Sequence, residues 1–105
     1  MKQIKFTYKD QNYILEYTRK TIKVMESNGF NINDIDTKPM VTIPALFKGA
    51  FLSKHRFVKD ELIDEIYKQM QHKDELVEAL MDMYADAIQS LFDEPEEGNL
   101  EWTKD

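Results

Sequence analysis

The sequence predicts an α+β fold: an N-terminal β-hairpin followed by about four α-helices, with a flexible acidic C-terminal tail. Three observations support this prediction. Apolar and polar residues alternate over the first 17 positions, and from residue 19 the apolar spacing becomes that of amphipathic helices. After Pro95 apolar residues become sparse. Because a chain of 105 residues has room for one modest core, we expect a single domain at 1–95 and an acidic tail at 96–105.

The hairpin prediction is based on a period of two. Every second residue is apolar in two runs, which are Ile4, Phe6 and Tyr8, and then Tyr13, Leu15 and Tyr17. The polar residues 9–12 link the two runs and predict a turn. Since an isolated hairpin is only marginally stable in water, the helices that follow must cover its apolar face.

Residues 19–27 predict a short helix. Thr18 suits the N-cap position, and Gly29 suits the left-handed conformation that ends many helices. Residues 31–39 are polar and rich in turn formers, so we expect a loop with a helical turn near Asn33.

The next predicted helix extends from residue 40 to about residue 55. Its apolar stripe consists of Ile43, Leu46, Phe47, Ala50 and Phe51. We expect Pro44 to lie in the first turn, where a missing N–H is tolerated. Gly49 weakens a helix interior by about 1 kcal/mol relative to alanine, so it predicts a close approach of another part of the chain.

Two further helices complete the domain. Residues 59–70 carry acids in the first turns, where the helix dipole favours them. Residues 74–94 form the longest and most regular pattern, which Pro95 ends. The inward positions of this last helix are predicted to be Leu76, Val77, Leu80, Met81, Tyr84, Ala87, Ile88, Leu91 and Phe92. Residues 99–103 have the spacing of a short strand.

The charge is divided between the two halves of the chain. Residues 1–59 hold eleven basic and five acidic residues, a balance of +6, and residues 60–105 hold three and fifteen, a balance of −12. Such a division favours binding to other proteins or to further copies of the chain, although charged runs are also typical of plain solvated faces. A pI near 4.9 argues against nucleic acid as the partner. No apolar run or leader indicates a membrane, so we expect a cytoplasmic protein.

The residues that carry catalysis or metal binding are scarce. Cysteine is absent, which excludes disulfides and thiolate ligands. His55 and His72 lack the spacing of paired ligands, and we expect both to be solvated at helix ends. No serine lies in a glycine-flanked turn, and three glycines do not form a phosphate loop. We therefore predict no catalytic, cofactor or metal site.

Protein binding is the better hypothesis. Six methionines and twelve aromatic residues accompany the apolar stripes, and methionine is common on adaptable surfaces, although each one also fits a core. Met83 lies off the main stripe of its helix. The residues that we predict to contact a partner are Leu46, Phe47, Phe51, Leu52, Met83 and Trp102.

Four stretches together resemble a known family. They are residues 13–32 (YILEYTRKTIKVMESNGFNI), residues 46–55 with Leu-Phe-Lys-Gly-Ala-Phe, residues 63–67 (IDEIY) and residues 96–102 (EEGNLEW). In this order, over nearly the whole chain, they are similar to the small DUF5055-type proteins of phages that infect Gram-positive bacteria. That family is usually described as tail assembly chaperones of long-tailed phages.

The resemblance implies a non-enzymatic chaperone in the host cytoplasm. Such a protein coats the tape measure protein, keeps it soluble, helps to recruit tail tube subunits and then leaves the finished tail. Opposite charges on the two halves of the chain would also permit head-to-tail self-association. Two alternatives remain open: a structural head–tail connector or other virion or prophage protein, and a small regulatory or inhibitor protein whose acidic tail mimics nucleic acid.

Overall fold

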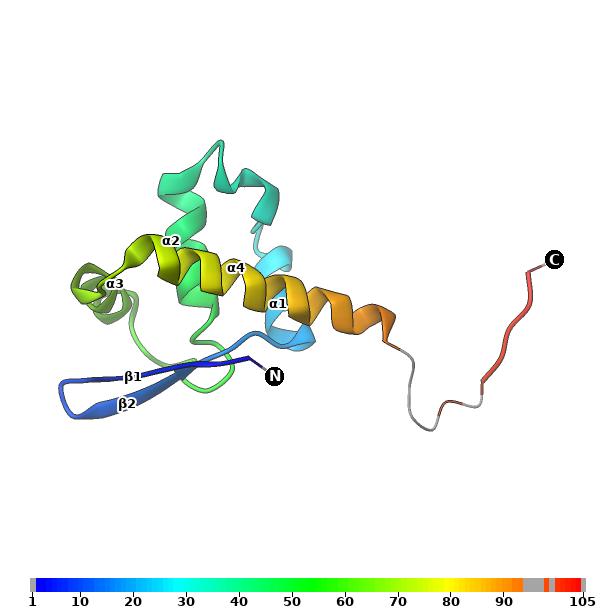
Figure 1. Cartoon of the computed structure of the whole chain (residues 1–105), viewed down its shortest axis with the longest axis horizontal. Coiled ribbons are helices and arrows are strands. Elements are labelled where there is room, and N and C mark those ends of the chain that lie inside the picture. The colour runs from blue at the N-terminus through cyan, green and yellow to red at the C-terminus, as the bar shows by residue number, and fades with distance from the viewer. Residues whose placement is uncertain (1, 94–97, 99, 105) are drawn as a thin grey trace.

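The computed structural model describes residues 2–93, 98 and 100–104. An antiparallel hairpin, β1 (Ile4–Tyr8) and β2 (Gln11–Leu15), comes first. Four helices follow it: α1 (Arg19–Ser27), α2 (Pro39–Gly49), α3 (Asp60–Gln69) and α4 (Lys73–Gln89). Short 3₁₀ turns lie at η1 (Ile32–Ile35) and η2 (Ser90–Phe92). The hairpin lies along one side of the helices (Figure 1), and the predicted fold class is confirmed.

The hairpin turn is tighter than the sequence predicted. Only Lys9 and Asp10 connect the strands, with φ values of 48° and 65°. Positive φ at both central residues matches the right-handed twist of paired strands. The resulting register places Ile4 opposite Leu15 and Phe6 opposite Tyr13, so the apolar side chains share one face.

The segment after α2 covers the outer edge of β2. Ile14 donates its backbone N–H to Nε2 of His55 at 3.0 Å, and Glu16 donates its N–H to the carbonyl of Ala50 at 3.1 Å. His55 is half-buried, and its ring packs at a tilt against Tyr13, with ring centroids 5.1 Å apart. The prediction of a solvated His55 was therefore wrong, because the side chain accepts a bond from a strand that is distant in sequence.

Local chemistry sets the ends of α1 where they were predicted. Thr18 and Thr21 form a capping box, in which the Thr18 hydroxyl accepts from the Thr21 N–H at 3.1 Å. Gly29 has a φ of 95°, which suits glycine at a helix end. The predicted helical turn near Asn33 is confirmed as η1.

Helix α2 differs from its prediction at both ends. It starts at Pro39, so Pro39 occupies the first turn and Pro44 lies inside the helix. It ends at Gly49, and residues 50–54 continue as turns that keep Ala50 and Phe51 buried. A Cβ at Gly49 would overlap the sulfur of Met25. The close approach predicted at Gly49 is therefore real, and the side chain of α1 makes it.

Helix α4 is rotated relative to the predicted stripe. Met83 is only 5% exposed, whereas Met81 is 36% exposed. The helix ends at Gln89, and Leu91 and Phe92 are exposed rather than inward. The buried core draws on the hairpin and on all four helices, and it consists of Tyr13, Leu15, Tyr17, Ile22, Met25, Leu46, Phe47, Ala50, Phe51, Ile63, Ile66, Leu76, Leu80, Met83 and Tyr84.

Residues 100–104 lie away from the domain (Figure 1). Leu100 to Thr103 are described without a strand, so the predicted strand is not formed in the single chain as far as those residues show. Pro95, the predicted end of the last helix, and residues 96, 97, 99 and 105 of the predicted tail lie outside the described residues.

A buried carboxylate connects three parts of the fold. Glu16 is 4% exposed and accepts hydrogen bonds from Oγ of Ser53 and from Nε2 of Gln3, the latter at 2.7 Å. The Ser53 bond is the main reason why the pKa of Glu16 lies below its ordinary value, and the Gln3 bond adds to this effect against the opposing effect of burial. The carboxylate therefore links β2 to the segment after α2.

We predict that Ser53→Ala lowers the free energy of unfolding by about 1–3 kcal/mol at pH 7, since it removes a donor from a buried charge. A lowered pKa stabilises the fold above the ordinary value of 4.5, and this stabilisation is lost as the pH falls through the folded value. The difference between the variant and the wild type should therefore shrink below pH 4.5. Urea titrations over a pH series measure this, with the exposed Ser27→Ala as the control. An equal difference at all pH values would contradict the account.

Candidate functional site

The predicted partner-binding residues have different surroundings in the fold. Leu46, Phe47, Phe51 and Met83 are buried core residues. Leu52 is half-buried, and Trp102 is exposed. Buried side chains cannot contact a partner unless the core opens, so the four core residues do not form a binding surface in this conformation. The physical reason is that apolar periodicity marks a face but does not show whether the chain itself covers that face.

An open apolar groove lies beside these core residues, between α1, η1 and α2. Its volume is about 540 Å³, which is in the range of pockets that bind ligands. Leu52, from the predicted set, lines it. Its apolar lining consists of Val24, Met25, Phe30, Val41, Ala45 and Leu52. We call this feature the α1–α2 groove.

Exposed apolar side chains lie on the walls of the α1–α2 groove. Val24 on α1 is 43% exposed, and Val41 in the first turn of α2 is 71% exposed. Met40, next to Val41, is also exposed. These side chains contribute little to the core, so they are available to an apolar partner. Singly exposed apolar residues are common on any protein, and the signal here is their position on one hollow.

Local structure explains why Val24 and Val41 face the α1–α2 groove. The inward face of α1 is occupied by Thr21, Ile22 and Met25, which leaves Val24 at its side. In α2 the hydroxyl of Thr42 is directed toward the Asp34 carbonyl, at 3.4 Å, which places the preceding Val41 outward. Sequence reasoning missed both valines because it followed the main stripes. The signal that the sequence offered for such a surface was an apolar residue outside the main apolar stripe of its helix.

The edge of the α1–α2 groove is polar and carries both acidic and basic side chains. Asp34, Lys38 and Lys48 line it. Lys48 also forms an ion pair with Asp60 of α3, with Nζ 2.9 Å from the carboxylate. A hollow that is apolar inside and polar at its edge is the usual composition of a protein-binding patch.

A second, smaller hollow lies between α1 and the last turns of α4. Ile22, Ala87, Ile88 and Leu91 supply its apolar side, and its volume is about 510 Å³. Beside it, Oη of Tyr84 donates to Glu26 at 2.8 Å. Burial and this bond raise the pKa of Tyr84. The hollow is flanked by the charged residues Arg19, Lys23 and Glu26 and has the smaller apolar lining, so we regard it as the secondary candidate.

The two oppositely charged halves of the chain contact each other within the fold. Each ion pair among the described residues joins a lysine of residues 2–59 to an acid of residues 60–93. The pairs are Lys2–Asp86 at 3.1 Å, Lys9–Glu65 at 3.2 Å and Lys48–Asp60 at 2.9 Å. The division of charge seen in the sequence is therefore used in part to hold the hairpin and α2 to the later helices.

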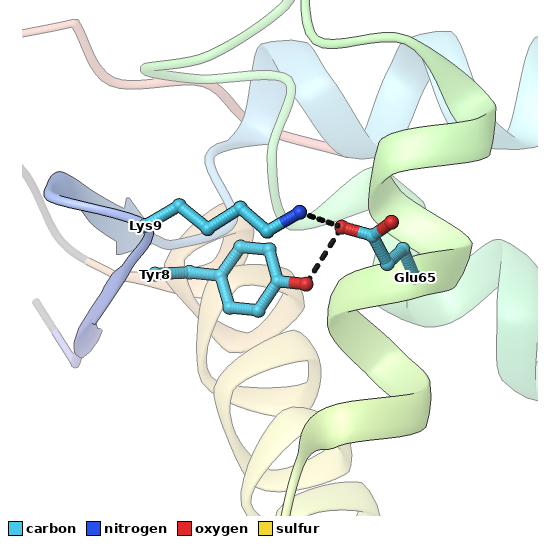
Figure 2. Close-up of polar contacts among 3 residues, drawn as sticks. All are labelled: Tyr8, Lys9 and Glu65. Atoms are coloured by element: carbon cyan, nitrogen blue, oxygen red, sulfur yellow. Dashed lines mark hydrogen bonds and ion pairs between the residues drawn. The ribbon is translucent and has the colours of Figure 1, made fainter.

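Figure 2 shows the most connected of these contacts, where the hairpin turn meets α3. Oη of Tyr8 donates to Glu65 at 2.6 Å, and Nζ of Lys9 lies 3.2 Å from the same oxygen. The Tyr8 hydrogen bond and then Lys9 lower the pKa of Glu65, and Glu65 raises the pKa of both partners. With raised pKa values, Tyr8 and Lys9 stay protonated near neutral pH and are not available as bases or nucleophiles, so the cluster fits a structural role.

Metal-ligand clusters and membrane-spanning helices are both absent from the part of the chain that the structure describes. Within residues 2–93, 98 and 100–104 no three His, Asp or Glu side chains gather as metal ligands would. Over the same residues no helix has the length and apolar character to cross a membrane.

We predict that Glu65→Gln lowers the melting temperature slightly at pH 7 and low salt. The effect should fade at high salt, because salt screens exposed pairs. It should also fade as the pH falls below 4.5, since the lowered pKa of Glu65 stabilises the fold only while the carboxylate is ionised. Asp64→Asn on the same helix is the matched control. A loss that is the same at all salt concentrations would show that the ion pair is not its cause.

Comparison with known proteins gives one match. No curated protein and no solved structure matches this chain. The model of one protein family, a domain of unknown function designated DUF5055, matches residues 1–105. Because the match spans the whole sequence, the chain belongs to the DUF5055 family.

Proposed function

We propose that this protein is a non-enzymatic phage tail assembly chaperone. It binds apolar helical segments of the tape measure protein in the host cytoplasm and keeps that protein soluble while the tail tube is assembled. The resemblance of residues 13–32, 46–55, 63–67 and 96–102 to such chaperones supports the identity of the partner. The surface of the domain supports the mode of binding.

The observation that carries the proposal is the α1–α2 groove. An amphipathic helix binds by placing its apolar face in an apolar groove, with anchors one turn apart. Val24 and Val41 lie on the walls of the groove and Leu52 lines it, while Lys38, Lys48 and Asp34 offer polar contacts at its edge. Apolar side chains of a partner helix would replace the water that now covers the two valines.

A weak site suits a protein that must leave its partner later. A tape measure protein is long, and many copies bound along one chain give high avidity from individually weak contacts. Arriving tail tube subunits then displace the copies one at a time. This scheme requires neither catalysis nor a cofactor, and the partners are proteins rather than nucleic acid or membrane.

The test is binding to a tape measure fragment by groove variants. Val41→Asp places a charge in the groove but near a helix N-terminus, where the helix dipole favours it, so the fold should survive. Losing the burial of one valine, about 1.5–3 kcal/mol, predicts a Kd increase of roughly ten- to hundredfold. Phe57→Asp, at an exposed residue that does not line the groove, is the control and should bind normally.

Co-expression extends this test to solubility. The wild type and Phe57→Asp should keep the tape measure protein in the soluble fraction, and Val41→Asp should not. Equal performance of all three proteins would contradict the proposed site. Mass spectrometry of purified virions separates the alternatives, since a chaperone should be missing from virions and a head–tail connector should be present.

A further inference from the structure

The strand β1 has a free outer edge. In this hairpin the N–H of Ile14 points away from β1, toward His55. Lys5 is paired with Ile14, so by the alternation of antiparallel ladders its N–H and carbonyl point away from β2. Thr7, two residues further on, has the same orientation. Among the described residues, the backbone groups of neither residue have a backbone hydrogen-bond partner on that side.

The two faces of β1 differ in character: the solvent face is basic, and the core face is apolar. Lys5 and Thr7 are exposed on the solvent face, and Lys2 and Lys9 lie beyond the two ends of the strand. Ile4, Phe6 and Tyr8 face the core but are only half-buried, so the apolar face of the sheet continues to its border. Lysines on an edge oppose pairing with a second basic edge, and they favour an acidic strand.

The chain carries a segment that fits this edge. Leu100 to Lys104 has five residues, as β1 does, and alternates apolar with polar side chains over its first four. Leu100 is 92% exposed and Trp102 is 82% exposed in the single chain, where the segment lies away from the domain (Figure 1). The surrounding residues 93–105 hold six acids and one lysine. Tryptophan is enriched at protein interfaces, so the exposed Trp102 is typical of an interface residue.

We propose that residues 100–104 of one copy add a third strand to the free edge of β1 in a second copy. In a register that places Glu101 beside Lys5, opposite charges pair on the solvent face. Leu100 and Trp102 then lie on the other face, beside the half-buried side chains of β1. Each copy has one edge and one segment, so the contact is heterologous and links copies head to tail. The contact uses neither groove valine, so a partner helix and a second copy bind at separate places.

Trp102 reports this contact directly, because it is the only tryptophan of the chain. With the full-length protein alone, its emission should shift to shorter wavelength as the concentration rises, and light scattering should show the mass rising in parallel. A shift without a change of mass would mean that the segment binds its own chain. No shift at any concentration would mean that the segment remains in water. Either result overturns the proposal.

Charge reversal tests the register. Lys5→Glu and Glu101→Lys should each weaken association roughly tenfold, because an attractive pair becomes repulsive, and the double variant should regain most of the loss. The controls are Lys20→Glu and Glu78→Lys, which make the same charge changes at exposed helical positions. Equal losses in the controls, or no recovery in the double variant, would refute pairing at this edge.

A mixture of variants tests the direction of the contact. Lys5→Glu retains the segment but has an impaired edge, whereas Trp102→Asp retains the edge but has an impaired segment. At a concentration above the Kd of the wild type and below the Kd of each variant, each alone should remain monomeric, and the two together should form a 1:1 dimer that does not grow. Longer assemblies or the absence of a dimer would contradict head-to-tail strand addition. The measurement needs no tape measure protein, so its result is independent of the proposed function.

Discussion

The burial of the C-terminal half of α2 and of the turn that follows it is the constraint on which the rest of this structure depends. Leu46, Phe47, Ala50 and Phe51 are all at most 1% exposed. The rings of Tyr13 from the hairpin and Tyr67 from α3 pack against this segment, and Tyr17 donates its hydroxyl to the Leu46 carbonyl at 2.6 Å. Helices α1 and α4 also contact α2. The hairpin and the other three helices therefore all pack against one apolar segment.

That constraint also determines where function can lie. The C-terminal half of α2 is buried in the core, so a partner of the proposed kind must bind to apolar residues that remain exposed. The two places that we favour are the α1–α2 groove, with Val24 and Val41 on its walls, and the free edge of β1. From the sequence alone, Lys2, Lys9 and Lys48 could have been assigned to contacts with a partner. In the structure they form ion pairs within the chain. Glu101, next to Trp102, belongs to the described residues 100–104, which lie away from the domain (Figure 1).

Features set by local chemistry could be predicted from the sequence. The period of two gave the bounds of β1, and the Thr18 cap with Gly29 gave both ends of α1. Features set by distant contacts could not be predicted. Two examples are the end of α2 at Gly49 and the exchange of Met83 for Met81 in the core, which depends on how α4 lies over its neighbours. Leu46, Phe47 and Phe51, which were predicted to bind a partner, do not form an exposed surface for the same reason. They have the strongest apolar pattern, and other parts of the chain pack over them.

Hydrogen exchange with and without a tape measure fragment tests the central claim, that partners bind around a core which stays closed. In the free protein the amides of residues 46–51 should exchange most slowly. Adding the fragment should slow exchange in α1 and in the first turns of α2, with residues 46–51 unchanged. Faster exchange at residues 46–51 on binding would contradict the account, because it would mean that the core opens and that Leu46, Phe47 and Phe51 contact the partner.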